Sequence, residues 1–172
     1  MASMHKNTIY QGNSVISVET LKGYSHPVVI KKPAKRHSSQ RSIRALENEY
    51  EMTRSLNAVE GVRRALGQQP GENQPVLVLE YIEGETLRHH ISGKTLNLRQ
   101  KLEIAVDLTR ILKEIHQQDI IHLDLNSKNI LIGKKDLAVH IVDLGSAARF
   151  SGNGHHKVRP DQLLGTLPYI SP

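Results

Sequence analysis

The chain has 172 residues and contains no cysteine, which excludes disulfides and thiolate metal sites and is typical of a cytoplasmic protein. This length predicts one domain with a core of useful size. A net charge of +6 is compatible with nucleic-acid binding, but only 3% of the residues are aromatic, so platforms for stacked bases are scarce. We expect no nucleic-acid partner and, because no apolar run approaches the length of a membrane span, no membrane partner.

The amino-terminal half predicts short strands around one helix. Residues 8–18 and 24–31 alternate in hydrophobicity and predict strands. Residues 38–56 are rich in charge and carry apolar residues at helical spacing, which predicts a helix. Residues 61–74 are rich in Gly, Gln and Pro and predict a loop, whereas residues 76–81 predict an apolar strand.

After Gly84 the pattern changes to that of a helix. Asn97 is followed three residues later by Gln100, which predicts a capping box at a helix start. Apolar residues then recur at spacings of three and four, which predicts an amphipathic helix of about five turns. These apolar residues are Leu98, Leu102, Ala105, Leu108, Leu112 and Ile115.

Three polar residues surround a predicted hairpin. Residues 130–132 and 138–142 read as two short strands joined by a turn, with Asn129 just before the first and Asp143 just after the second. Because the open ends of a hairpin lie about 5 Å apart, we expect Asn129 and Asp143 to meet, with Asp124 nearby. Amide and carboxylate oxygens suit Mg²⁺. The set predicts a phosphoryl-transfer site with a base and two metal ligands.

These motifs resemble the catalytic domain of a serine/threonine protein kinase. The run that ends at Lys31 resembles the strand with the phosphate-binding lysine, and Glu49 resembles the helix glutamate that pairs with it. Residues 77–84 resemble the strand and hinge that hold adenine. Residues 165–172 resemble the end of an activation segment.

The resemblance implies an α+β, protein-kinase-like fold with ATP and Mg²⁺ as cofactors. Residues 1–84 would form a small antiparallel β-rich N-lobe, and residues 85–172 an incomplete, mainly helical C-lobe. The implied catalytic residues are Asp124, Lys31 and Glu49, the implied nucleotide-binding residues are Gly12, Ser14, Lys31, Glu80 and Ile82, and the implied metal ligands are Asn129 and Asp143.

Several positions depart from the kinase pattern. Only Gly12 remains of three expected glycines in the loop that covers the phosphates, although Ser14 is small enough to substitute for one. Leu123 replaces the arginine that usually precedes the catalytic aspartate, so we expect no switch through a phosphorylated activation loop. Asn126 stands where serine/threonine kinases carry a lysine, and Leu144 replaces a phenylalanine while keeping its apolar character.

A narrower resemblance concerns the amino-terminal kinase domain of large bacterial hybrid sensors. In these proteins the kinase domain precedes an ATPase-like module, a GAF domain and a histidine kinase. Residues 10–12, 27–31 and 164–172 are similar to that group. The resemblance implies that the chain is a fragment or the product of a truncated gene, with sensor modules of the same polypeptide as further partners.

The sequence therefore predicts ATP-dependent phosphoryl transfer to Ser/Thr hydroxyls of protein substrates in signalling. Two alternatives stay open: a nucleotide-binding pseudokinase or scaffold, favoured by the eroded glycine loop, and a small-molecule phosphotransferase that shares the Asp-x-x-x-x-Asn loop. We interpret His122 as a packed loop residue that orients the catalytic segment. We expect the isolated chain to be poorly soluble and nearly inactive, because the apolar face of the helix at residues 98–115 would stay partly exposed.

Overall fold

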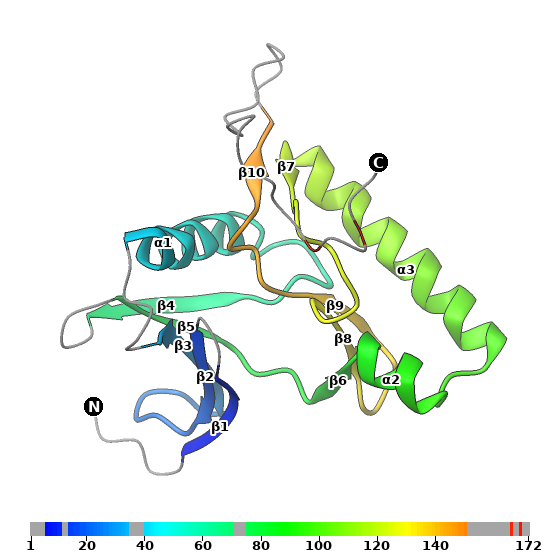
Figure 1. Ribbon diagram of the computed structural model, residues 1–172, viewed down its shortest axis with the longest axis horizontal. Coiled ribbons are helices and arrows are strands. Elements are labelled where there is room, and N and C mark those ends of the chain that lie inside the picture. Colours follow the sequence, from blue (N-terminus) through cyan, green and yellow to red (C-terminus); the bar gives the residue numbers. More distant parts are fainter. Residues whose placement is uncertain are drawn as a thin grey trace.

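The computed structural model describes residues 6–11, 14–34, 40–70 and 75–150, together with Thr166 and Tyr169. The prediction of an α+β kinase-like fold is confirmed (Figure 1). In chain order the elements are β1 (Lys6–Gln11), β2 (Ser14–Glu19), β3 (Val28–Pro33), α1 (Gln40–Ser55), β4 (Ala65–Pro70), β5 (Pro75–Glu80), β6 (Gly84–Thr86), α2 (Leu87–Gly93), α3 (Leu98–Gln117), β7 (Ile120–Ile121), β8 (Ile130–Gly133), β9 (Val139–Ile141) and β10 (Ala148–Arg149).

A five-stranded antiparallel sheet has the strand order β1-β2-β3-β5-β4, and α1 packs against β3, β4 and β5 (Figure 1). Strand alternation sends successive side chains to opposite faces. Val29 and Leu77 therefore pack in one apolar cluster with Leu46 of α1, whereas Val28 and Val78 pack in another. Both faces of the central strands are covered, which makes β3 a rigid support.

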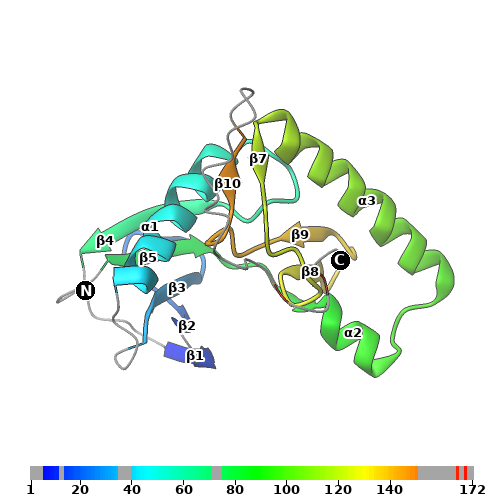
Figure 2. The same ribbon diagram turned by 45° about the horizontal axis from the view of Figure 1, so that its top comes forward.

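The second part of the structure surrounds a three-stranded sheet of order β6-β8-β9 (Figure 2). α3 packs against β7 and β9, and residues 81–83 connect β5 to β6. The largest apolar cluster joins Ile111 and Ile115 of α3 to Ile132 and Ile141 of the sheet, and it includes Leu56, just after α1. This shared cluster fixes the β8–β9 hairpin relative to α1.

Two predictions about the strands need correction. The prediction of a loop at residues 61–74 is wrong, because residues 65–70 form β4 and pair with β5. The Gly- and Gln-rich run has weak strand propensity, but the edge of β5 supplies backbone partners that override it. The strand predicted at residues 24–31 begins only at Val28. The short elements α2, β6, β7 and β10 were not predicted.

The capping box at the start of α3 is confirmed. Asn97 Oδ1 accepts from Gln100 N at 2.9 Å, and Gln100 Oε1 accepts from Asn97 N at 2.9 Å. The predicted apolar stripe is only partly buried: Leu98 and Leu102 are 73% and 59% exposed. The residues of α3 that are fully buried are Ile104, Ile111 and Ile115.

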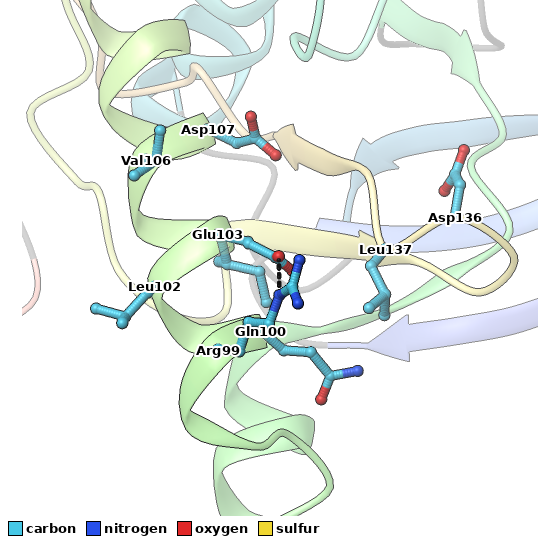
Figure 3. A pocket seen from close by; sticks show the side chains of 9 residues that line it. Arg99, Gln100, Leu102, Glu103, Val106, Asp107, Asp136 and Leu137 are labelled. Carbon is cyan, nitrogen blue, oxygen red and sulfur yellow. Dashed lines mark hydrogen bonds and ion pairs between the residues drawn. The ribbon is translucent and has the colours of Figure 1, made fainter.

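A shallow groove of about 480 Å³ runs along α3 beside the turn that joins β8 to β9 (Figure 3). Leu102 and Val106 line it together with Leu137 of the turn. Arg99 and Glu103, which form an ion pair, also line it. No helix among the described residues is long and apolar enough to cross a membrane.

Gly84 provides a first prediction, because β6 approaches β8 closely at this residue. A Cβ on Gly84 would collide with the carbonyl oxygen of Ile132 and lie 3.0 Å from its carbonyl carbon. Backbone atoms in a paired strand cannot move away, so Gly84→Ala should lower the free energy of unfolding by about 1–3 kcal/mol. Gly67→Ala in β4 is the control, since its Cβ would meet nothing closer than Tyr24 Oη at 3.7 Å. Equal losses for both variants in chemical denaturation would contradict the prediction.

Candidate active site

The site centres on the ammonium of Lys31 in β3. Its Nζ lies 2.7 Å from Oε2 of Glu49 in α1 and 2.9 Å from Oδ1 of Asp143, which follows β9. Lys31 and Glu49 are 6% and 3% exposed, whereas the side chain of Asp143 is 44% exposed. The structure thus brings together three residues that the sequence predicted, from three different elements.

Charge and burial compete at this cluster. Burial alone would lower the pKa of Lys31, but the carboxylates of Glu49 and Asp143 outweigh it and raise that pKa above its ordinary value. Burial raises the pKa of Glu49, although Lys31 opposes the shift. At Asp143 burial is outweighed by the Lys31 ammonium, and the pKa is lowered. Lys31 therefore stays protonated and Asp143 ionised at neutral pH.

The β8–β9 hairpin brings Asn129 to Asp143, as predicted. Ile130 pairs with Ile141, and Val142 N donates to Asn129 O at 3.0 Å. Asn129 Nδ2 donates to Asp124 O at 2.9 Å, which leaves the amide oxygen as the atom for a cation. This oxygen and the half-exposed Asp143 carboxylate are hard ligands that fit Mg²⁺.

The loop around Asp124 is held by its own side chains. Asp124 N donates to His122 Nδ1 at 3.3 Å, and His122 Nε2 lies 3.1 Å from Val142 O. Since Nδ1 accepts, the ring proton lies on Nε2 and is donated to Val142 O. Burial lowers the pKa of His122, which keeps the ring neutral. This geometry supports the interpretation of His122 as a residue that orients the loop.

Two residues of the site have left-handed backbone conformations. Leu123 has φ 61° and Asp143 has φ 64°, and neither is glycine. Such conformations cost of order 1–3 kcal/mol each and persist where surrounding contacts fix them. They turn the chain so that Asp124 and Asp143 reach the same site.

Sequence reasoning missed two residues that hold this cluster. Asn48 of α1 donates from Nδ2 to Gly145 O at 3.1 Å and to Ala147 O at 2.9 Å, which ties α1 to the segment after Asp143. Arg63 lines a small internal space with Glu49 and Asp143, and its Nε has no hydrogen-bond partner among the described residues. Its guanidinium is a second cation beside the two carboxylates. The sequence carries no spacing that distinguishes Arg63 from the exposed Arg64.

The remaining predicted residues are placed as follows. Ser14 begins β2 opposite Pro33 of β3, whereas Gly12 lies outside the described residues. Glu80 ends β5. Its carboxylate forms an ion pair with Arg64 at 2.6 Å, so the side chain of Glu80 is already engaged and does not contact a ligand. Ile82 lies in the connection between β5 and β6.

The protein kinase domain model matches residues 6–172 of the chain. The chain belongs to the protein kinase domain family. It is 35% identical over 105 residues to the serine/threonine-protein kinase PknB of Mycolicibacterium smegmatis. The matched residues make up 60% of this chain and 16% of that protein. A probable serine/threonine-protein kinase of fowlpox virus, FPV212, is 39% identical over 93 residues, or 51% of this chain and 31% of that protein.

A plant relative, the calmodulin-binding receptor-like cytoplasmic kinase 2 of Arabidopsis thaliana, is 34% identical over 108 residues, or 58% of this kinase domain and 26% of that protein. The kinase domain described here thus spans a small share of the curated relatives that it matches.

The buried ion pair provides a second prediction. Lys31→Met leaves the Glu49 carboxylate buried without its nearest cation, and breaking a buried pair in this way costs about 3–5 kcal/mol. The pKa of Glu49 should rise further in the variant, so its folded state binds a proton that the unfolded state releases. Its stability should therefore fall as pH rises above about 4.3, the ordinary pKa of a glutamate.

Lys32→Met is the matched control, because Lys32 is the next residue of β3 and points to the opposite face. Denaturation curves at several pH values measure both effects. A Lys31→Met variant as stable as Lys32→Met at every pH would contradict the electrostatic account of the site.

Proposed function

We propose that this kinase domain transfers the γ-phosphoryl group of ATP to Ser or Thr hydroxyls of protein substrates. The single observation that carries the proposal is the meeting of Lys31, Glu49 and Asp143 beside Asn129 and Asp124. ATP would supply the phosphoryl group and Mg²⁺ would offset its charge. The residues present fit both, since the buried Lys31 ammonium contacts the Asp143 carboxylate and the Asn129 amide oxygen is a second hard ligand.

Each side chain has a definite task in the proposed reaction. Lys31, aligned by Glu49, would bind phosphate oxygens, and Asn129 and Asp143 would hold Mg²⁺ through their oxygens. Asp124 would orient the substrate hydroxyl and accept its proton as the new bond to phosphorus forms. The backbone of residues 80–82 would hold adenine, since the Glu80 carboxylate is paired with Arg64.

We also propose that residues 1–84 act as the N-lobe and residues 85–172 as part of the C-lobe, with the nucleotide between them. The change from the five-stranded sheet to the α3 region at Gly84 supports this division. The residue patterns at 10–12 and 27–31 support a place in a cytoplasmic hybrid sensor that signals through further modules of one polypeptide. The names of the matched relatives support the serine/threonine class over a small-molecule phosphotransferase.

Nucleotide binding provides a third prediction. Mg-ATP at 100 times its dissociation constant should stabilise the fold by about 2.7 kcal/mol. Asp143→Ala should abolish the part of this shift that requires Mg²⁺. Asp136→Ala, in the turn of the same hairpin, should keep it, because among the described residues the Asp136 side chain accepts a hydrogen bond only from Ala138 N, within its own turn. An unchanged melting temperature of the folded protein at millimolar Mg-ATP would exclude both the kinase and the nucleotide-binding pseudokinase.

Catalysis provides a fourth prediction, tested in the full-length protein. Asp124→Asn removes the proton acceptor and should lower kcat about 10²–10⁴-fold, while the dissociation constant for Mg-ATP stays nearly constant. Asp119→Asn, the same chemical change in the preceding loop, is the control. Peptide phosphorylation that survives in Asp124→Asn would show that another group takes the proton. Phosphorylation of a small alcohol in place of a peptide would favour a small-molecule phosphotransferase.

A further inference from the structure

The side chain of Asn126 occupies the centre of the catalytic loop and is only 5% exposed. Its Oδ1 accepts a hydrogen bond from Lys128 N at 2.9 Å, and its Nδ2 donates to Asp124 O at 3.0 Å. These two backbone partners, one donor and one acceptor, fix which end of the amide is which. One hydrogen of Nδ2 is therefore donated to Asp124 O, and the second remains for another acceptor.

The same nitrogen reaches the end of the activation segment. Asn126 Nδ2 lies 3.1 Å from Thr166 Oγ1, and Thr166 Oγ1 lies 2.7 Å from Asp124 Oδ1. A hydroxyl carries one proton, and an amide NH₂ can only donate. Because Thr166 accepts from Asn126, it directs its own proton to the carboxylate. The result is an ordered chain from amide to hydroxyl to carboxylate.

This chain makes the two oxygens of Asp124 different. Oδ1 receives the Thr166 proton at 2.7 Å and a weaker contact from Asn126 at 3.3 Å. Among the described residues, Oδ2 receives only a long contact from Asn129 Nδ2 at 3.4 Å. Oδ2 is therefore the oxygen of Asp124 with more unused capacity to accept a proton.

We infer that Asn126 is a positioning residue that commits Oδ1 of Asp124 to Thr166 and leaves Oδ2 as the atom that takes the substrate proton. The inference rests on the proposed function. In the step itself, the substrate hydroxyl oxygen bonds to the γ-phosphorus of ATP, the bond from that phosphorus to the ADP oxygen breaks, and the hydroxyl proton moves to Asp124 Oδ2. Asn126 performs this positioning with a neutral amide, at the place where the kinase resemblance implies a lysine.

A double-mutant cycle in the full-length protein tests the chain of hydrogen bonds. Asn126→Ala and Thr166→Val should each lower kcat about tenfold, with the KM for ATP changed less than about twofold. The double variant should lose little more than either single variant, because both changes break one chain. Thr166→Ser keeps the hydroxyl and should retain most of the activity.

Asn57→Ala is the matched control, since Asn57 also binds backbone with both ends of its amide, at Ala65 O and Ala65 N, away from the site. It should lower the melting temperature without lowering kcat. Losses that simply multiply in the Asn126→Ala/Thr166→Val double variant, or a loss seen in KM for ATP and not in kcat, would overturn the inference.

A second measurement does not depend on activity. In ¹H–¹⁵N spectra of the full chain, Thr166→Val should shift the side-chain amide resonances of Asn126, assigned by their loss in Asn126→Ala, and leave those of Asn57 in place. Unshifted Asn126 resonances would overturn the inference. If the protein transfers no phosphate but shows this shift, the proposed function is refuted, whereas the hydrogen bond by which Asn126 positions Thr166 is supported.

Discussion

The ammonium of Lys31 lies within 2.9 Å of two carboxylates, and this buried cluster joins the parts of the fold that form the site. β3 supplies the cation, α1 supplies Glu49, and the end of the β8–β9 hairpin supplies Asp143. Taking the charges of Lys31 and Glu49 out of water is costly, so the cluster persists only while all three elements hold their places. The arrangement of sheet, helix and hairpin is thus coupled to the electrostatics of the site.

Neutral amides do much of the remaining positioning. Asn48 ties α1 to the segment after Asp143, Asn129 ties the hairpin to Asp124, and Asn126 ties the catalytic loop to Thr166. An amide offers one donor end and one acceptor end, so it can fix a backbone without adding charge to a cluster that already contains two cations and two anions.

Much of the fold was predictable, because local patterns specify local structure. The capping box at Asn97 and the β8–β9 hairpin are confirmed by short-range contacts that the sequence itself encodes. The failures lie where partners are distant. β4 forms because β5 offers it a free edge, and α3 buries Ile104, Ile111 and Ile115 rather than Leu98 and Leu102, because only one of its faces meets the sheet.

By itself, the sequence predicted which residues could carry the chemistry: Asp124, Asn129 and Asp143 from their spacing and residue type, and Lys31 and Glu49 from the resemblance to protein kinases. Only the tertiary structure decided how they are held. Lys31 and Asp143 are in contact although they lie 112 residues apart in the chain. Arg63 lies beside the same cluster, and no sequence motif marks it. The direction of the hydrogen bond from Thr166 to Asp124 likewise depends on Asn126, forty residues away in the chain. Periodicity reports neighbours along the chain, whereas burial and hydrogen-bond direction depend on neighbours in space.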